Sequence, residues 1–317
     1  MFDFTALGEL LIDFTEGRPT EDGRRTFEQN AGGAPANAAC VVAAHQNSTA
    51  FIGKVGCDLH GDFLIRTLEE HNVDTSGLVR DPNVFTTLAF VALEKNGERK
   101  FSFARKPGAD TCLTMQELMP PSLRTRVLHV GSLSLTDEPA RGATLEAIRI
   151  AKKNGALLSF DPNYRAPLWP NERTAADQMR SLLPQADLLK LSLEEAPLLC
   201  GESTPQKVLD ALAKKGVKLI ALTDGANGSF VRLYEKTCFI PAFSVQAVDT
   251  TGAGDIFWGA FLSRLLKSAH SLSSLTPDSA ADFARYASGA AALSVQRRGG
   301  IPSIPRPEEI VSFLEKQ

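Results

Sequence analysis

The chain has 317 residues, of which 43% are hydrophobic and 22% are charged, and its formal net charge is −3. This composition can bury a large core, and the slightly acidic balance excludes a basic surface for nucleic acid or membrane lipids. The five cysteines are odd in number and show no C-x-x-C spacing, which argues against a disulfide framework or a zinc site. The sequence has no basic leader and no run of about 18 apolar residues. We therefore expect a cytoplasmic protein whose partners are small molecules.

The N-terminal segment predicts a first strand over residues 4–14, because this run is mostly apolar. Glu9 and Asp13 interrupt the run, and a carboxylate is costly to bury there without a partner. A carboxylate at a strand end can accept hydrogen bonds from ligand hydroxyls. Exposure of the strand end to water is the simpler interpretation of Asp13.

Residues 17–31 are polar and are expected to be irregular, and a helix of small residues follows as far as about Ala44. Gly32 and Gly33 precede this helix, where glycine permits a close approach of the backbone to a ligand. Asn37 offers both a donor and an acceptor for a polyol. A lone Gly-Gly pair is more often only a tight turn, and that alternative stays open.

Two strand-like segments, 86–94 and 99–104, flank an Asn-Gly pair at 96–97, which is the strongest short signal for a β-hairpin. An antiparallel hairpin does not belong inside a βαβ sequence. We therefore expect an inserted flap, formed from segments of about 14–31 and 84–110, within a single domain that spans residues 1–317.

From residue 127 onward strands and helices alternate, which predicts a doubly wound α/β fold with ligands at the carboxyl ends of its strands. The expected strands are 127–131, 157–161, 187–191 and 217–223, and the expected helices are 138–154, 204–215, 278–297 and 306–315. The helix 278–297 is rich in Ala, Ser and Gly, so it can pack tightly or form the wall beside a flat ring.

Three of these strand ends carry polar or glycine-rich motifs. The DPNYR segment 161–165 offers an acid, an amide and a guanidinium that can bind hydroxyls and phosphate oxygens together. The TDGANG segment 223–228 has glycines that permit close approach to a nucleotide, although such a segment is often an ordinary turn. Ser192 and Glu195 have the spacing of a capping box, which is a sufficient structural explanation for both.

The segment DTTGAGD, residues 249–255, runs directly into an apolar helix. Gly252 and Gly254 let successive N–H groups point at one position, as at a helix N-terminus that holds an anion. Asp255 in the first turn can act as a base beside amides that stabilise the transferred group. The simpler interpretation is an acid that complements the helix dipole, worth about 0.3–1 kcal/mol.

Together these motifs resemble the ribokinase-like carbohydrate kinases, the PfkB family, in order and approximate spacing over nearly the whole chain. The fructokinases are the most similar branch. The resemblance implies a doubly wound, mostly parallel sheet flanked by helices, with a small antiparallel β lid. In that family the lid closes over the sugar and often forms the contact of a homodimer, so we expect a homodimer through the lid.

The resemblance also implies an ATP-dependent transfer of the γ-phosphate to a primary hydroxyl of a ketohexose, with fructose as the expected sugar. Asp255 is the implied general base. The amides around Gly252, Ala253 and Gly254 stabilise the developing charge together with Arg165. ATP and Mg²⁺ are the implied cosubstrate and cofactor, and K⁺ is a candidate activator.

The remaining implied roles fall into three sets. The sugar-binding residues are Asp13, Gly32, Gly33, Asn37, Arg105, Asp161, Asn163 and Asp255. The nucleotide-binding residues are Lys190, Thr223, Gly225, Gly228, Gly252 and Gly254. Glu195 is implied as a magnesium ligand through water, and Asp249, Thr251, Ser294, Gly299 and Ser303 form a candidate potassium site.

Two positions depart from the family pattern. Ala104 stands where many related kinases have Tyr, which leaves the sugar open among fructose, ribose, 2-keto-3-deoxygluconate and a nucleoside. Ser192 stands where the family has Asn. For Arg105, a charged side chain that is solvated on the hairpin remains an alternative to sugar binding. The alternative from another class is a non-catalytic sugar-binding protein, which the intact Asp255 disfavours.

Overall fold

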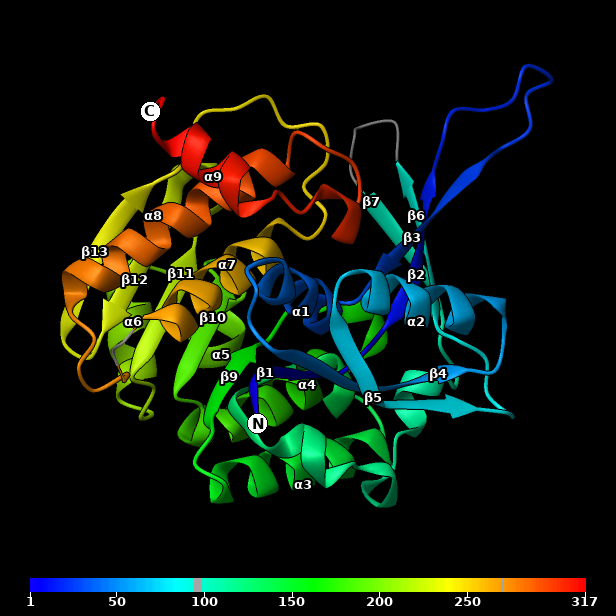
Figure 1. The fold of residues 1–317 in the computed structure, drawn as a ribbon, viewed down its shortest axis with the longest axis horizontal. Helices are drawn as coiled ribbons and strands as arrows, with labels where there is room; N and C mark the ends of the chain where they lie inside the picture. Colours follow the sequence, from blue (N-terminus) through cyan, green and yellow to red (C-terminus); the bar gives the residue numbers. More distant parts are fainter. Residues whose placement is uncertain (94–98, 269–270) are drawn as a thin grey trace.

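The fold is built on a nine-stranded sheet, which the computed structural model shows within residues 1–93, 99–268 and 271–317, the part of the chain that it describes (Figure 1). The strand order is β13-β12-β11-β10-β9-β8-β1-β4-β5. The strands are β1 (Phe2–Leu7), β4 (Thr49–Gly56), β5 (Val73–Asp81), β8 (Thr125–Gly131), β9 (Leu157–Asp161), β10 (Leu188–Ser192), β11 (Leu219–Thr223), β12 (Gly228–Leu233) and β13 (Lys236–Pro241). Among these strands β12 pairs antiparallel with both β11 and β13, and the other pairs are parallel, so the expectation of a mostly parallel sheet is confirmed.

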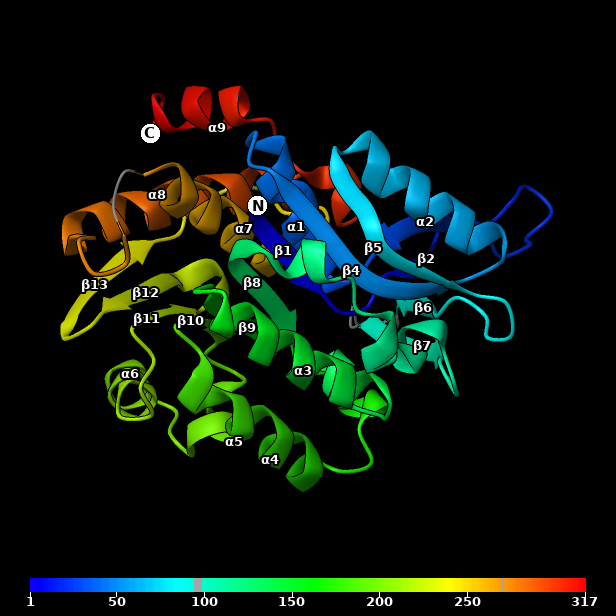
Figure 2. The same ribbon diagram turned by 60° about the horizontal axis from the view of Figure 1, so that its bottom comes forward.

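Helices cover both faces of this sheet (Figure 2). The first layer contains α1 (Ala34–Ala44), α2 (Leu59–Glu70), α7 (Ala253–Lys267), α8 (Pro277–Ser294) and α9 (Pro307–Leu314). The second contains α3 (Ala140–Lys153), α4 (Glu172–Leu182), α5 (Ala196–Cys200) and α6 (Pro205–Ala213). Successive strand residues face opposite layers, so Leu188 belongs to the core of the first layer and Leu189 to that of the second. This explains the continuous apolar runs in the sequence.

The helices α1 and α7 pack in direct contact at a glycine of α7. A Cβ on Gly259 would lie 2.7 Å from Val41 Cβ and 3.0 Å from the carbonyl oxygen of Ala38, so only glycine fits without a shift of either helix. The contact brings the first turns of the two helices together, where Asn37 of α1 reaches Asp255 of α7.

A second sheet of four strands lies beside the large one, in the order β3-β2-β6-β7 (Figure 1). Its strands are β2 (Leu11–Glu16), β3 (Phe27–Gly32), β6 (Leu88–Leu93) and β7 (Arg99–Ala104). The antiparallel pairing of β6 with β7 agrees with the hairpin expected there, while the Asn-Gly turn at 96–97 lies outside the described residues. The chain between β2 and β3 projects well beyond the rest of the molecule.

The structure corrects the sequence-based elements at three places. The single strand expected over residues 4–14 is wrong, because the chain leaves the large sheet after Leu7 and enters the small sheet at Leu11. Residues 27–32, expected to be irregular, form β3 through backbone pairing with β2. The strands β12 and β13, at one end of the large sheet, were not predicted. The pattern of hydrophobic residues does not show which of two sheets a buried segment joins. It also does not show whether a polar segment pairs as a strand.

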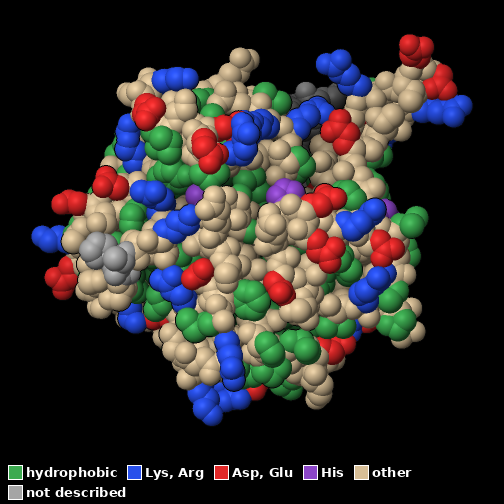
Figure 3. All heavy atoms as spheres, in the orientation of Figure 1, with side chains coloured by type: hydrophobic (Ala, Val, Ile, Leu, Met, Phe, Trp, Pro, Cys, Tyr) green, Lys and Arg blue, Asp and Glu red, His purple; other side chains and the backbone are tan. Residues whose placement is uncertain are grey.

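Surface charge, cysteine state and helix character can be compared with the expectations from composition. On the face shown in Figure 3, acidic and basic side chains are interspersed rather than gathered in one patch. All five cysteines are free thiols. Throughout the described parts of the chain, each helix falls short of the length or the apolar character that crossing a membrane requires.

Candidate active site

The first turn of α7 follows a glycine in the left-handed backbone conformation. Gly252 has φ 73° and forms the N-cap, and its carbonyl accepts the hydrogen bond from the Ile256 N–H. A side chain at Gly252 would meet Gly300 Cα at 3.0 Å and Asn37 Nδ2 at 3.3 Å, so both conformation and space require glycine. The first N–H groups of a helix have no partner within the helix, and here they provide the positive end of its dipole.

Asp255 is buried in this first turn, and its Oδ2 accepts a 2.8 Å hydrogen bond from Asn37 Nδ2. Burial raises the pKa of Asp255 to about 6, opposed by the charge of Lys190 and assisted by that of Asp161. A carboxylate with this pKa is mostly ionised at neutral pH and is still a stronger base than an ordinary aspartate. Asp255 therefore has the properties of a general base.

A buried ion pair lies next to the same turn. Lys190 Nζ donates a 2.8 Å hydrogen bond to Asp161 Oδ2, which joins the middle of β10 to the end of β9. Burial lowers the pKa of Lys190, but the carboxylates of Asp161, Glu195 and Asp255 outweigh it and the pKa is raised. A Cβ on Gly254 would lie 2.9 Å from Lys190 Nζ, so a fixed positive charge stands directly beside the helix end. Such a charge suits the binding of phosphate oxygens.

Three cavities meet at this helix end, and we call them the inner, middle and outer cavities. The inner cavity measures about 160 Å³, the middle about 650 Å³ and the outer about 440 Å³. The inner and middle cavities share Asn163, Arg165, Thr250, Gly252 and Asp255, whereas the middle and outer cavities share Thr250, Ala253 and Gly254. One continuous path therefore passes Asp255 and the free amides of α7. It can hold one ligand in the inner cavity and an extended second ligand in the other two.

Most residues expected to bind the sugar lie in or beside the inner cavity. Its wall includes Asp13, Gly33, Asn37, Asn163 and Asp255. Asp161 lies behind it in the pair with Lys190, and Gly32 packs so closely on the Asp13 carboxylate that a side chain there would overlap it.

Arg105 lies one layer behind the cavity wall. Its guanidinium pairs with Asp110 at 2.7 Å and donates to Thr136 Oγ1 and to the carbonyl oxygen of Leu133, each at 2.9 Å. Leu133 itself lines the inner cavity, so Arg105 supports the wall through this residue. The sequence-based alternative of a solvated hairpin charge is wrong, because the Arg105 side chain is only 2% exposed.

The residues expected to bind the nucleotide lie along the other two cavities. Lys190 and Gly254 line the middle cavity, and Thr223, Gly225 and Gly228 line the outer one. The outer cavity is also walled by the small residues of α8, namely Ser288, Ala291 and Ala292. The Ala-rich helix therefore forms one wall of the outer cavity, and a flat ring bound against it stays a prediction.

Glu195 makes the capping contacts expected from its spacing. Its Oε2 accepts from the Ser192 N–H at 2.9 Å and from Ser192 Oγ at 3.0 Å, while its Oε1 accepts from the Tyr164 N–H at 2.7 Å. Glu195 lines the middle cavity with both oxygens already engaged, which fits contact with a cation through water rather than directly. Among the described residues, no three His, Cys, Asp or Glu side chains form a cluster that could hold a metal ion.

Two of the candidate potassium residues, Thr251 and Gly299, hydrogen-bond to Asp249. Asp249 Oδ1 accepts from Thr251 Oγ1 at 2.7 Å, and its Oδ2 accepts from the Gly299 N–H at 2.9 Å. The hydroxyls of Ser294 and Ser303 donate to nearby carbonyl oxygens at 2.8 Å. A hydroxyl that has donated its proton keeps its oxygen lone pairs for a cation, so this donor set fits a hard, oxygen-loving ion.

Some residues of the site had no assigned role in the sequence analysis. Thr250 lines all three cavities, and Phe243 lies in the outer one. Glu9, noted only as an acid in an apolar run, lines the inner cavity. Thr250 could have been found as part of the glycine-rich motif, whereas the segment of Phe243 carries no sequence signal.

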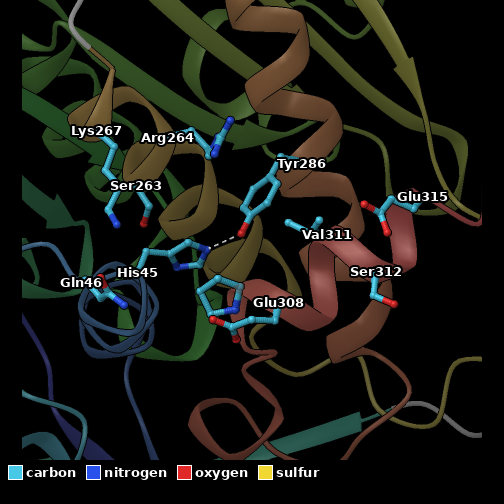
Figure 4. A pocket seen from close by; sticks show the side chains of 11 residues that line it. His45, Gln46, Ser263, Arg264, Lys267, Tyr286, Glu308, Val311, Ser312 and Glu315 are labelled. Carbon is cyan, nitrogen blue, oxygen red and sulfur yellow. Dashed lines mark hydrogen bonds between the residues drawn. The ribbon is translucent and has the colours of Figure 1, made fainter.

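A separate cavity of about 410 Å³ lies at the opposite end of α7, between α1, α8 and α9 (Figure 4). His45 and Tyr286 form a 2.9 Å hydrogen bond in its wall, and Arg264 lies over the Tyr286 ring. None of the residues expected to bind sugar, nucleotide or metal lines it. The predicted chemistry is therefore concentrated at the N-terminal end of α7.

The site combines a buried carboxylate in the first turn of α7 with cavities at the carboxyl edge of a doubly wound sheet, and this arrangement suits phosphoryl transfer. The model of the pfkB family carbohydrate kinases matches residues 1–307, and the chain belongs to this family. The chain is 41% identical to fructokinase-1 of Zea mays over 318 residues, which covers 98% of this chain and 97% of that protein.

Solved structures agree with this assignment. The fructokinase of Xylella fastidiosa with bound ATP superposes with a TM-score of 0.92 and 34% identity, covering 100% of this chain and 99% of that one. A double mutant of the Vibrio cholerae O395 fructokinase, with fructose, ADP and potassium ion bound, gives a TM-score of 0.89 and 30% identity over 99% and 98% of the two chains. The protein is thus a sugar phosphotransferase with a ribokinase-like fold.

Kinase turnover should depend on the ionisation of Asp255. Because the base must be deprotonated and its pKa is raised to about 6, kcat should fall as the pH drops through about 6. Asp255→Ala should lower kcat by about 10²- to 10⁴-fold and leave sugar binding largely intact. Steady-state kinetics between pH 5 and 8, with a sugar-binding titration, measure both effects.

Asp278 provides the matched control, since it is also an acid in the first turn of a helix but is exposed on α8. Asp278→Ala should keep normal turnover and the same acid limb. Near-normal turnover of Asp255→Ala would contradict the assignment of the base.

Proposed function

We propose that this protein is an ATP-dependent fructokinase, which transfers the γ-phosphate of ATP to a primary hydroxyl of fructose. The observation that carries the proposal is the position of Asp255, at the junction of the inner cavity with the path formed by the middle and outer cavities. The relatives named above, which are fructokinases, support fructose as the sugar.

In this proposal Asp255 accepts the proton of the sugar hydroxyl while the hydroxyl oxygen attacks the γ-phosphorus and ADP leaves. Asn37 holds the Asp255 carboxylate through its hydrogen bond, so that the base keeps one orientation. The amides around Gly252, Ala253 and Gly254 stabilise charge on the transferred group, assisted by Arg165. Mg²⁺ bound with the polyphosphate, close to Glu195, would supply charge neutralisation.

The small sheet fits the role of a lid. It contributes Asp13 and Thr15 from β2, and Val91 and Phe103 from β6 and β7, to the wall of the inner cavity. A sheet that covers the sugar excludes water, which would otherwise compete with the sugar hydroxyl for the phosphoryl group. The lid is assigned to the inserted segments 14–31 and 84–110 of a single domain.

The free thiols of the chain support a reducing compartment, and we extend the proposal to a cytoplasmic location. Fractionation of cells is the direct measurement. Recovery of the protein outside the cytoplasmic fraction would contradict this part of the proposal.

The small sheet should also mediate a homodimer. Phe27, Phe85 and Phe90 are 38%, 61% and 36% exposed, and Phe90 packs on both Phe14 and Phe27. Exposed aromatic clusters of this kind are typical of protein interfaces. Sedimentation velocity should give the mass of a dimer, and Phe90→Asp should shift it toward the monomer.

Val311→Asp is the control for this change, because Val311 is 47% exposed on α9 in the other part of the molecule. It should leave the dimer intact. A monomeric wild-type protein at micromolar concentration would refute the assembly and leave the kinase assignment untouched.

Potassium should activate the enzyme. The oxygen ligands around Asp249 lie directly before the α7 turn, so a bound cation would fix the loop that supplies the amides. Activity in K⁺ should exceed activity in Na⁺ at equal ionic strength, and Asp249→Asn should reduce the difference. Equal rates of the wild type in both salts would exclude this role.

The sugar is tested with a panel. ATP consumption by the purified protein, with Mg²⁺ and K⁺ present, is compared for fructose, ribose, glucose, 2-keto-3-deoxygluconate and a nucleoside at equal concentrations. We expect the highest kcat/KM with fructose. A higher value with another sugar would refute fructose but retain the kinase, whereas no turnover with any of them would favour a non-catalytic sugar-binding protein.

A further inference from the structure

Glu9 is a buried acid that no step of the proposed mechanism uses. It lies in the connection from β1 to β2, is 2% exposed and lines the inner cavity. Its Oε1 accepts a 3.1 Å hydrogen bond from the N–H of Ala34, the first residue of α1. Its Oε2 is buried and has no hydrogen-bond partner in the ranges of the chain that the structure describes. One oxygen of this carboxylate is therefore satisfied and the other is not.

An unsatisfied carboxylate oxygen in a protein interior is costly, so its presence calls for a partner from outside the chain. The cation whose charge acts on Glu9 is Arg105, but its guanidinium is already bound to Asp110, Thr136 and the Leu133 carbonyl. Burial raises the pKa of Glu9 to about 7, assisted by the charge of Asp110 and opposed by Arg105 and by backbone hydrogen bonds. The surrounding chain thus leaves this carboxyl group short of favourable contacts.

The cavity that Glu9 lines is the one that would hold the sugar, and its other walls include the apolar side chains of Leu11, Val91 and Leu133. A sugar hydroxyl is the donor that this proposed function would bring there. Building on the proposed function, we propose that Glu9 is a sugar-binding residue whose Oε2 accepts a hydrogen bond from a non-reacting hydroxyl of the acceptor sugar.

The charge of Glu9 also bears on which sugars fit. With Glu9, Asp13 and Asp255, three acidic side chains line a cavity of about 160 Å³ that contains one cationic side chain, Arg165. A neutral polyol gains acceptors from these groups, whereas a sugar acid would place a fourth acidic group among them. Glu9 thereby selects for neutral sugars over acid sugars.

A purely structural role for Glu9 would consist of capping the Ala34 amide and balancing Arg105. Glu9→Gln separates the two roles, because the amide oxygen can still accept from Ala34 while an NH₂ group replaces the Oε2 acceptor. Asp110→Asn is the matched control, since Asp110 is buried in the same charged cluster but does not line the inner cavity.

The experiment measures KM for the sugar, KM for ATP and kcat for the wild type and both variants, using the best substrate of the sugar panel. At pH 8, where Glu9 with its pKa of about 7 is mostly ionised, Glu9→Gln should raise the sugar KM by about 10- to 100-fold, as for a lost hydrogen bond to a charged group, with kcat and the ATP KM changed little. Asp110→Asn should leave the sugar KM within a few-fold of the wild type. The discrimination against 2-keto-3-deoxygluconate should also weaken in Glu9→Gln.

Deoxy analogues of the sugar identify the contact directly. Removal of the hydroxyl that Glu9 accepts from should weaken binding to the wild type and add little to the loss in Glu9→Gln, while other deletions should act equally on both proteins. Equal sugar KM values in the wild type and Glu9→Gln would overturn the proposal, as would an increase shared with Asp110→Asn. If Glu9→Gln does not fold, the pattern of deoxy analogues is measured with Glu9→Asp, which keeps the charge and shifts the acceptor.

These outcomes are separate from those of the proposed function. A wild type without any kinase activity refutes the kinase, whereas an active kinase with an unchanged Glu9→Gln refutes only the role of Glu9.

Discussion

The site depends on the close contact between α1 and α7. Gly259 lets α7 approach the backbone of α1 near Ala38, and this approach sets the distance between the first turns of the two helices. Asn37 and Asp255 then meet at 2.8 Å, although they are 218 residues apart in the chain. Because the two helices are nearly all buried, the base is oriented by rigid packing rather than by a loop. The geometry of the hydrogen bond between Asn37 and Asp255 therefore depends on the absence of a side chain at Gly259.

The electrostatics of the site follow from its burial. The carboxylates of Asp255, Asp161 and Glu9 are buried from solvent. The positive charges near them are those of Lys190 and Arg165. Lys190 is paired with Asp161, so Asp255 keeps a raised pKa despite a nearby ammonium group. A base held in this way is neutralised neither by protonation at pH 7 nor by a direct ion pair. The same desolvation strengthens the effect of the α7 amides on the transferred phosphoryl group.

The sequence predicted the chemistry of the strand ends better than the course of the chain between the sheets. DPNYR at 161–165, Thr223 to Gly228 and Asp255 were placed correctly at strand or helix ends, because glycine, proline and charge mark such positions locally. The break after Leu7 was missed, since the apolar residues on both sides are equally buried in two different sheets. The contacts of Arg105 and Glu9 were also beyond reach, because they join segments whose proximity only the tertiary fold determines.

The groups expected to set sugar specificity and those expected to carry catalysis lie on different parts of the fold. The groups expected to act on the phosphate lie on helix ends and strands of the large sheet, such as α7 and β10. Several groups expected to contact the sugar, Glu9 and Asp13 among them, lie where the chain leaves that sheet and enters the small one. A substitution in the connection can therefore alter the choice of sugar without moving Asp255, Lys190 or the amides. On the proposed roles, sugar selectivity depends largely on the connection between the two sheets, and phosphoryl transfer depends on the large sheet and its helices.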